Sequence, residues 1–156
     1  MIKFLIKLKK QGKLKIGESS KEMQKSYIEK SESNFISAKI LLKNNRLEES
    51  VSLAYYNMYN LLLALLFRIG IKSENHTASV IMLKEIFEID NSEILFAKKE
   101  MVDKQYYVDF HFVEKDVKVL IKKAEEFNKM LLDFISKLNN NMIGLYQKKF
   151  KEIIEK

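Results

Sequence analysis

The sequence predicts an all-α protein, an up-down bundle of four or five helices with short extra N- and C-terminal helices. The chain of 156 residues contains no proline and only four glycines, so few residues interrupt helices. Its apolar residues recur at intervals of three and four, which is the spacing of one helix face. At this length a single domain with a substantial core is expected.

The N-terminal stretch IKFLIKLKK at residues 2–10 is short, basic and amphipathic. We assign residues 1–16 to an N-terminal extension. Ser19 followed three residues later by Glu22 has the pattern of a capping box, in which two side chains satisfy free N–H groups at a helix start. The apolar periodicity behind it predicts a helix over residues 20–43.

A second long helix is predicted over residues 47–69, and Gly70 is suited to the left-handed position that ends many helices. The second half of this helix is apolar almost all round, so it should be the central and most buried helix. Ser73 or Asn75 can cap a third helix that continues through Phe87.

Asn91 and Ser92 open a fourth predicted helix. The segment Tyr106–Val113 then alternates apolar and polar residues, which is strand-like. Because an isolated strand would leave its backbone groups without partners, we interpret the segment as a helix end followed by an extended connector.

A regular apolar stripe predicts a further helix from Glu114 to about Leu138. Asparagines at 139–141 interrupt it before a last amphipathic helix. The predicted organisation is therefore a bundle over residues 17–138 and a C-terminal helix over residues 139–156.

The composition excludes several classes of function. Without cysteine the chain can form neither disulfides nor thiolate metal sites, which fits the reducing cytoplasm where we expect it. The longest apolar run, Leu61–Phe67, is far shorter than the ~20 residues that span a bilayer, so no membrane span is expected. Two histidines and no carboxylates at metal spacing predict neither a metal nor a cofactor.

The formal charge of +7 is concentrated at the N-terminus, where six lysines precede Glu18, the first acidic residue. The remainder of the chain is nearly neutral. The basic extension could bind RNA phosphates, lie on an anionic membrane or dock a partner protein, and charge alone does not separate these possibilities. We favour partner docking or a modest attraction for RNA.

Three stretches carry a resemblance to a known family: AKILLKNNRLEESVSLAYYNMYNLLLALLFRIG at residues 38–70, ENHTASVIML at 74–83, and DKQYYVDFHFVEKDVKVLIKKAEEFNKML at 103–131. In this order they resemble the HEPN superfamily (higher eukaryotes and prokaryotes nucleotide-binding). The resemblance is greatest to its small stand-alone prokaryotic branch, whose members are encoded beside minimal nucleotidyltransferases.

The resemblance implies a helical bundle that forms a homodimer and works with a minimal nucleotidyltransferase as a two-component toxin–antitoxin pair. Active members of the family are metal-independent ribonucleases whose motif is Arg, four to six residues, then His. The dimer brings two copies of this motif together in one cleft. In one subfamily a tyrosine two positions after the histidine can be nucleotidylated by the partner.

This chain departs from that motif. Its only arginines, Arg46 and Arg68, lie far upstream of His111. The place of the arginine is taken by Lys104, or by Met101 if the alignment is anchored on the QYY stretch. Valine follows two positions after the histidine, so the modifiable tyrosine is also missing from its usual place.

Such a site would need a proton acceptor for the ribose 2′-OH and a cation for the developing negative charge. His111 suits the first role, and Lys104 can supply a point charge although not the planar fork of an arginine. Tyr106 and Tyr107 precede the histidine and are candidates for contacting a nucleotide. The simpler interpretation is that His111 is a half-buried connector residue and that Tyr106 and Tyr107 are packing residues whose hydroxyls face water.

Polar residues also interrupt the central helix, where Tyr55, Tyr56, Tyr59 and Asn60 are candidates for stacking and binding a nucleotide in a shared cleft. Aromatic rows at helical spacing more often belong to the core, where their polar groups fix helix register. His76, at the predicted start of the third helix, is expected to cap it and close the turn after Gly70, and a ligand role is the less favoured alternative.

Two classes of function follow. The first is a binding module, a dimeric HEPN protein that engages a nucleotidyltransferase or binds a nucleotide or RNA. The alternative is a metal-independent endoribonuclease toxin that uses His111 with Lys104. The missing arginine favours the binding module.

Overall fold

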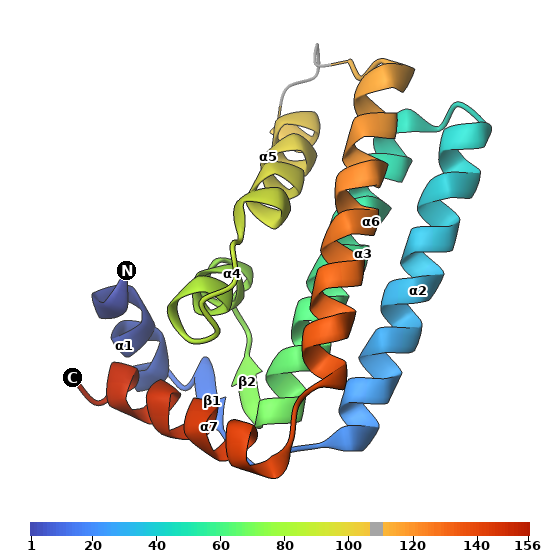
Figure 1. Cartoon of the computed structure of the whole chain (residues 1–156). Helices are drawn as coiled ribbons and strands as arrows, with labels where there is room; N and C mark the ends of the chain where they lie inside the picture. Colours follow the sequence, from blue (N-terminus) through green and yellow to red (C-terminus); the bar gives the residue numbers. More distant parts are fainter. Residues whose placement is uncertain (107–110) are drawn as a thin grey trace.

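The computed structural model describes residues 1–106 and 111–156, with backbone alone for 104–106, and it is an all-α bundle as predicted (Figure 1). The elements are, in chain order, α1 (Ile2–Lys10), β1 (Leu14–Ile16), α2 (Lys21–Lys43), α3 (Leu47–Ile69), β2 (Ile71–Ser73), α4 (His76–Glu85), α5 (Ser92–Tyr106), α6 (Glu114–Ser136) and α7 (Asn140–Ile154).

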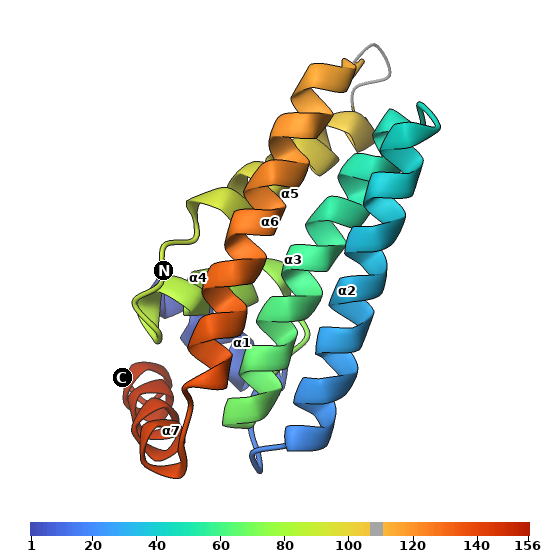
Figure 2. The ribbon, with the colours of Figure 1, turned by 45° about the vertical axis from the view of Figure 1, so that its right-hand side comes forward.

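Three long helices, α2, α3 and α6, run side by side (Figures 1 and 2). α3 contacts both of the others and also α5, so it occupies the middle of the bundle. α1, α7 and the two short strands lie together at the end of the molecule where both termini are found (Figure 1). This arrangement confirms the predicted central position of α3.

The burial of α3 follows from its composition. By length and hydropathy alone this helix could cross a membrane, but 72% of its most apolar window of 18 residues is buried inside the protein. Tyr55, Met58, Leu62 and Leu65 are all 0% exposed. α3 therefore contributes its apolar side chains to the core, where each buried leucine stabilises the fold by about 1.5–3 kcal/mol.

Side-chain caps mark the starts of α2, α4 and α7, and the cap of α2 differs from the prediction. Ser20, rather than Ser19, caps α2, and its Oγ accepts a hydrogen bond from the backbone N–H of Met23 at 3.1 Å. Ser19 instead exchanges hydrogen bonds with Arg68. The capping-box prediction was therefore one residue early, because the long-range bond of Ser19 competes with local capping.

Asparagine side chains cap α4 and α7. Asn75 accepts a hydrogen bond from the N–H of Ala78 at 2.8 Å, so of the two predicted caps of α4 it is the one used. Asn139 accepts from the N–H of Met142 at 2.9 Å, and α7 begins at the next residue. The predicted interruption at 139–141 is thus a cap followed by helix.

A two-stranded antiparallel ribbon between β1 and β2 was not predicted. Lys15 lies opposite Lys72 in its register, and the N–H of Gly17 donates to the carbonyl of Gly70 at 2.7 Å. Strands of three residues are too short to show a period in the sequence, and the partner strand is distant along the chain. The left-handed conformation of Gly70, with φ +98°, turns α3 directly into β2.

The connection between α5 and α6 includes residues 107–110, which are outside the described residues. α5 ends at Tyr106 and α6 begins at Glu114, close to the predicted boundaries. The predicted extended connector between them falls partly on those residues and stays a prediction.

Candidate functional site

The polar side chains of α3 point to two different sides of the helix. Tyr56, Tyr59 and Asn60 are three and four residues apart and therefore share one face. Asn57 lies on another face, toward α6, where it is 1% exposed. The two groups contribute to separate cavities.

The first cavity has a volume of about 390 Å³ and lies between α2, α3 and the start of α4. Three of its residues come from α2, five from α3 and one from α4. They are Tyr27, Lys30, Asn34, Leu53, Tyr56, Tyr59, Asn60, Leu63 and His76. We refer to it as the tyrosine–histidine pocket. It combines aromatic rings, amides, a lysine and an imidazole.

His76 is held in this pocket by contacts with three tyrosines. Its ring stacks on Tyr59 with centroids 3.9 Å apart and planes 16° apart. Its Nδ1 lies 3.0 Å from the hydroxyl oxygen of Tyr55. The ring of Tyr56 stands perpendicular to it at 6.5 Å. These contacts fix the position of the imidazole, although the side chain remains exposed on its outer side.

The environment also fixes the protonation state of this pair. Burial, followed by the neighbouring Tyr59 and Tyr56, raises the pKa of Tyr55 well above its ordinary value, so its hydroxyl stays protonated. Burial, followed by the charge of Lys98, lowers the pKa of His76. Because the buried hydroxyl of Tyr55 makes no other hydrogen bond with a described residue, we assign it as the donor to Nδ1, which places the imidazole proton on Nε2.

Nε2 of His76 is therefore an N–H donor, and no described residue accepts a hydrogen bond from it. The ring of Tyr59 is committed to the stack, and its hydroxyl lies 3.3 Å from Oγ of Ser79. Ser79 in turn donates within the β2–α4 turn, to Ser73 at 2.8 Å or Asn75 at 3.0 Å. The start of α4 is thus tied to α3 through Tyr59, while one donor of the imidazole is left for a ligand.

A pair of amides lines another wall of the pocket. Nδ2 of Asn60 donates to Oδ1 of Asn34 at 2.7 Å, which links α3 to α2. This bond leaves the oxygen of Asn60 as an acceptor and the nitrogen of Asn34 as a donor, a combination that can read the edge of a base. Lys30 lies 5.8 Å from the centre of the Tyr27 ring and supplies a positive charge at the rim.

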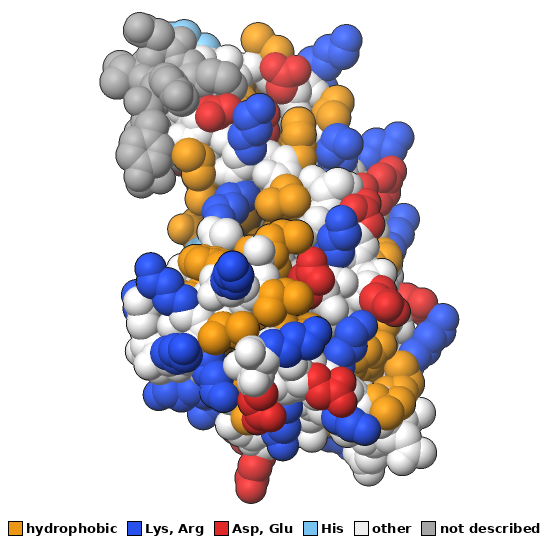
Figure 3. Space-filling model, turned by 90° about the vertical axis from the view of Figure 1, so that its left-hand side faces the viewer, with side chains coloured by type: hydrophobic (Ala, Val, Ile, Leu, Met, Phe, Trp, Pro, Cys, Tyr) orange, Lys and Arg blue, Asp and Glu red, His pale blue; other side chains and the backbone are white. Residues whose placement is uncertain are grey.

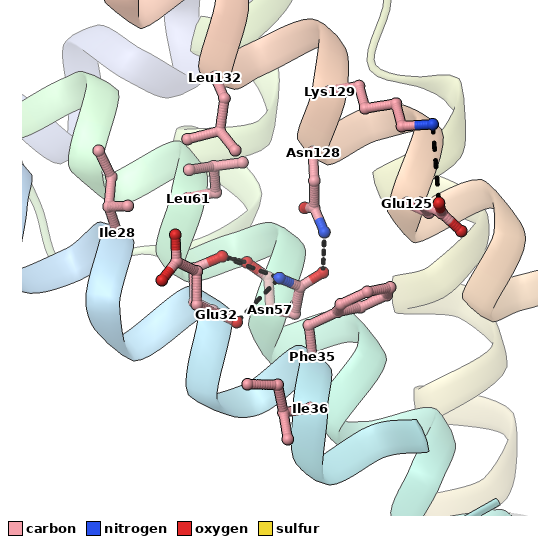
Figure 4. A pocket seen from close by; sticks show the side chains of 11 residues that line it. Ile28, Glu32, Phe35, Ile36, Asn57, Leu61, Glu125, Asn128, Lys129 and Leu132 are labelled. Atoms are coloured by element: carbon pink, nitrogen blue, oxygen red, sulfur yellow. Dashed lines mark hydrogen bonds and ion pairs between the residues drawn. The ribbon is translucent and has the colours of Figure 1, made fainter. Parts of the chain in front are cut away.

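The second cavity, of about 280 Å³, lies between α2, α3 and α6 (Figure 4). It is lined mainly by apolar side chains, together with the amide of Asn57. Nδ2 of Asn57 donates to the carbonyl of Ser31 at 2.9 Å and to its Oγ at 2.8 Å. Oδ1 of Asn57 accepts from Nδ2 of Asn128 at 3.0 Å. This network joins three helices, so its polar groups serve the packing of the bundle.

Of the predicted nucleotide-binding residues on α3, the structure brings Tyr56, Tyr59 and Asn60 into one pocket. Tyr55 is fully buried behind the pocket, and its hydroxyl orients His76. The side chain of Tyr106 and all of Tyr107 are outside the described residues. Their predicted role is therefore not tested.

The predicted catalytic pair of His111 and Lys104 is not tested by the structure. His111 is exposed just before α6, whereas the side chain of Lys104 is outside the described residues. Both arginines have structural contacts: Arg46 pairs with Glu49 at 3.0 Å, and Arg68 is 9% exposed where it bonds to Ser19. In the part of the chain that is described, no cluster of three His, Asp or Glu side chains could hold a metal ion.

His76 was not among the predicted nucleotide-binding residues, although a ligand role was its less favoured alternative. The sequence suggested a capping role for it, but Asn75 is the cap and His76 is the first helical residue. Tyr27, Lys30 and Asn34 were missed as well, because α2 meets α3 only in the folded bundle. One available signal was the tyrosine row itself, since an aromatic row can accept a stacked imidazole.

Comparison with known sequences agrees with this organisation. The family model of the HEPN domain matches residues 24–137. No curated protein matches this chain. The matched range begins within α2 and ends just after α6, so it includes every residue that lines the tyrosine–histidine pocket. It leaves out α1, β1 and α7.

Proposed function

Because the chain belongs to the HEPN-domain family, we propose that it acts mainly as a binding module whose tyrosine–histidine pocket takes the base of a nucleotide or of RNA. The observation that supports this proposal is the oriented imidazole of His76, stacked on Tyr59 and hydrogen-bonded by Tyr55, beside the exposed ring of Tyr56. Stacking of one base on an aromatic side chain is worth about 1–3 kcal/mol.

The other groups of the pocket fit the remaining parts of a nucleotide. Nε2–H of His76 can donate to a phosphate or carbonyl oxygen, while the amides of Asn34 and Asn60 offer one donor and one acceptor to a base edge. Lys30 provides a cation for a phosphate. A pocket with only apolar walls would offer no hydrogen-bond donor, no acceptor and no cation.

Binding of adenosine monophosphate, measured by calorimetry, tests this proposal. Tyr56→Ala and His76→Ala should each weaken binding by about tenfold or more, since each removes a stacking surface. Phe96→Ala is a matched control, because Phe96 lies on α5 and has the same exposed fraction as Tyr56, 39%. Loss of binding in the control but not in Tyr56→Ala would place the nucleotide elsewhere and contradict the proposal.

We further propose that the protein is the HEPN component of a two-component system, in which a homodimer binds a minimal nucleotidyltransferase. The family resemblance supports the partner. The dimer is supported by Ile36 and Ile40, one turn apart on α2 and each 55% exposed. Co-purification from the native host tests the partner, and sedimentation of Ile36→Glu/Ile40→Glu tests the dimer.

The alternative function, an endoribonuclease that uses His111 with Lys104, requires a histidine that RNA can reach. His111 is exposed, which keeps this function as a second candidate. Without the arginine of the family motif we expect slow or no cleavage of RNA in EDTA. Cleavage that disappears in both His111→Ala and Lys104→Ala would instead favour the nuclease.

A further inference from the structure

α1 has one apolar side and one basic side, and the apolar side is already used within the protein. Leu5 and Leu8 are 0% and 4% exposed, and α1 packs against α7. The lysines of this helix, in contrast, are all exposed. A helix that lies on a membrane inserts its apolar side into the lipid, so α1 in this packing has no free apolar side to insert.

The ribbon next to α1 adds two further positive charges. Lys15 of β1 and Lys72 of β2 are directly opposite each other, and both are exposed. Like charges in this position repel and destabilise the pair. The ion pairs between described residues all lie elsewhere, on the helices α3, α6 and α7 and their neighbours. Glu18 and Glu74 are the acidic residues next to the ribbon in the sequence.

A hollow of about 390 Å³ lies between α1 and the end of α7. It is lined by Ile6, Lys9, Lys10, Ile154, Glu155 and Lys156. Three lysine side chains therefore border it with one acidic side chain, that of Glu155. Figure 3 shows Lys and Arg side chains gathered over the lower part of the side on which the termini lie.

We define the basic terminal face as Lys3, Lys7, Lys10, Lys13, Lys15 and Lys72, all of which are exposed. One of its lysines is close to the tyrosine–histidine pocket along the chain, because β2 leads from Lys72 into α4 and His76 is four residues further on. Four residues span at most about 14 Å. A polynucleotide with one base in the pocket could therefore reach Lys72 and its partner in the ribbon, Lys15.

We propose that the basic terminal face binds the phosphate backbone of a single-stranded RNA, one base of which occupies the tyrosine–histidine pocket. The inference rests on the proposed function and specifies its ligand as a polynucleotide. One nucleotide carries too few phosphates to neutralise lysines from a helix, a loop and two strands. Most of the face lies outside the matched HEPN range of residues 24–137, so it is an addition to the family's domain.

The test measures binding of a 20-nucleotide single-stranded RNA across a salt series. In Lys3→Gln/Lys7→Gln/Lys10→Gln we expect affinity at low salt to fall by about tenfold. The slope of log affinity against log salt should become shallower by about 2, since each lost phosphate contact removes about 0.7. The control Lys118→Gln/Lys122→Gln/Lys129→Gln removes the same charge from exposed positions of α6 and should leave the slope close to that of the wild type.

Equal losses in the two triple variants, or no loss in the α1 variant, would overturn the inference. Binding of the wild type to vesicles containing phosphatidylserine, but not to RNA, would also overturn it in favour of a membrane. His76→Ala should weaken RNA binding without changing the salt slope. The protein could bind RNA through these lysines and yet fail to bind adenosine monophosphate. That result would support RNA binding by the basic terminal face and contradict only the proposed nucleotide pocket.

Discussion

The hydroxyl oxygen of Tyr55 lies 3.0 Å from Nδ1 of His76, and this contact joins the centre of α3 to the start of α4. Tyr55 is fully buried while His76 is exposed on its outer side, so the hydrogen bond extends from the core to the surface. It fixes both the orientation of the imidazole and the nitrogen that carries its proton. The pocket is therefore arranged before any ligand arrives, which lowers the cost of binding.

Replacing Tyr55 with phenylalanine should raise the pKa of His76. The hydroxyl donates to the neutral imidazole, and a hydrogen bond to the neutral form disfavours the charged form. Removing it leaves burial and Lys98 as the causes that lower this pKa. An NMR titration of His76 measures the change, with Tyr146→Phe on α7 as the control. An unchanged pKa in Tyr55→Phe would show that the bond does not govern the histidine.

The free energy of unfolding should decrease as the pH falls through about 6.5, the ordinary pKa of histidine. Because the pKa of His76 is lowered in the folded state, the unfolded state binds more protons at this residue in that range, so acid favours unfolding. Above this range both states are neutral at His76, and its contribution is fully present. Urea unfolding between pH 7.5 and 5 measures the effect.

His76→Gln should remove this part of the pH dependence. His111→Gln is the matched control, because it removes the other histidine, which lies before α6 and outside the pocket. Equal pH profiles for the wild type and His76→Gln would contradict the proposed linkage.

Gly70→Ala and Gly144→Ala should change stability in opposite directions. A Cβ at Gly70 would overlap the carbonyl oxygen of Gly17, and the residue has φ +98°, so we expect a loss of more than about 1 kcal/mol. Gly144 lies within α7 with nothing within 4 Å of an added Cβ. Alanine there should increase the free energy of unfolding by about 0.5–1 kcal/mol. A stable Gly70→Ala protein would argue against the close contact between the two turns.

Asn57→Ala should destabilise the bundle by about 2 kcal/mol or more, because the carbonyl of Ser31 and the amide of Asn128 would lose their hydrogen bonds to this buried side chain. Ser33→Ala, on the exposed side of α2, is the control and should have little effect. Urea unfolding of both variants measures the difference. A cost below about 0.5 kcal/mol would show that the network adds little to the packing of α2, α3 and α6.

The long helices could be predicted from the sequence because their apolar periodicity extends over many turns. The bounds of α3 and the role of Gly70 at its end were predicted correctly, since both depend on local patterns. The β1–β2 ribbon could not be predicted, because its register depends on two segments far apart in the chain. Ser19 shows the same limit. It bonds to Arg68 in the folded protein, and Ser20 rather than Ser19 caps α2.

In the candidate site too, features within one helix could be predicted, whereas contacts between helices could not. Tyr56, Tyr59 and Asn60 could be predicted to share a face from their spacing on one helix. Their contact with His76 and Asn34 depends on how α4 and α2 pack against α3, which the sequence does not state directly. Lys104 and His111 remain a prediction, because the geometry between them involves residues outside those described.

The most direct test of the proposed pocket is the set of intermolecular NOEs between adenosine monophosphate and the protein. A base bound in the tyrosine–histidine pocket should give NOEs from its ring protons to those of Tyr56 and His76. In His76→Ala the NOEs to Tyr56 should weaken as binding is lost. NOEs confined to residues around His111 and Phe96, with none to Tyr56 or His76, would contradict the proposed location of the nucleotide.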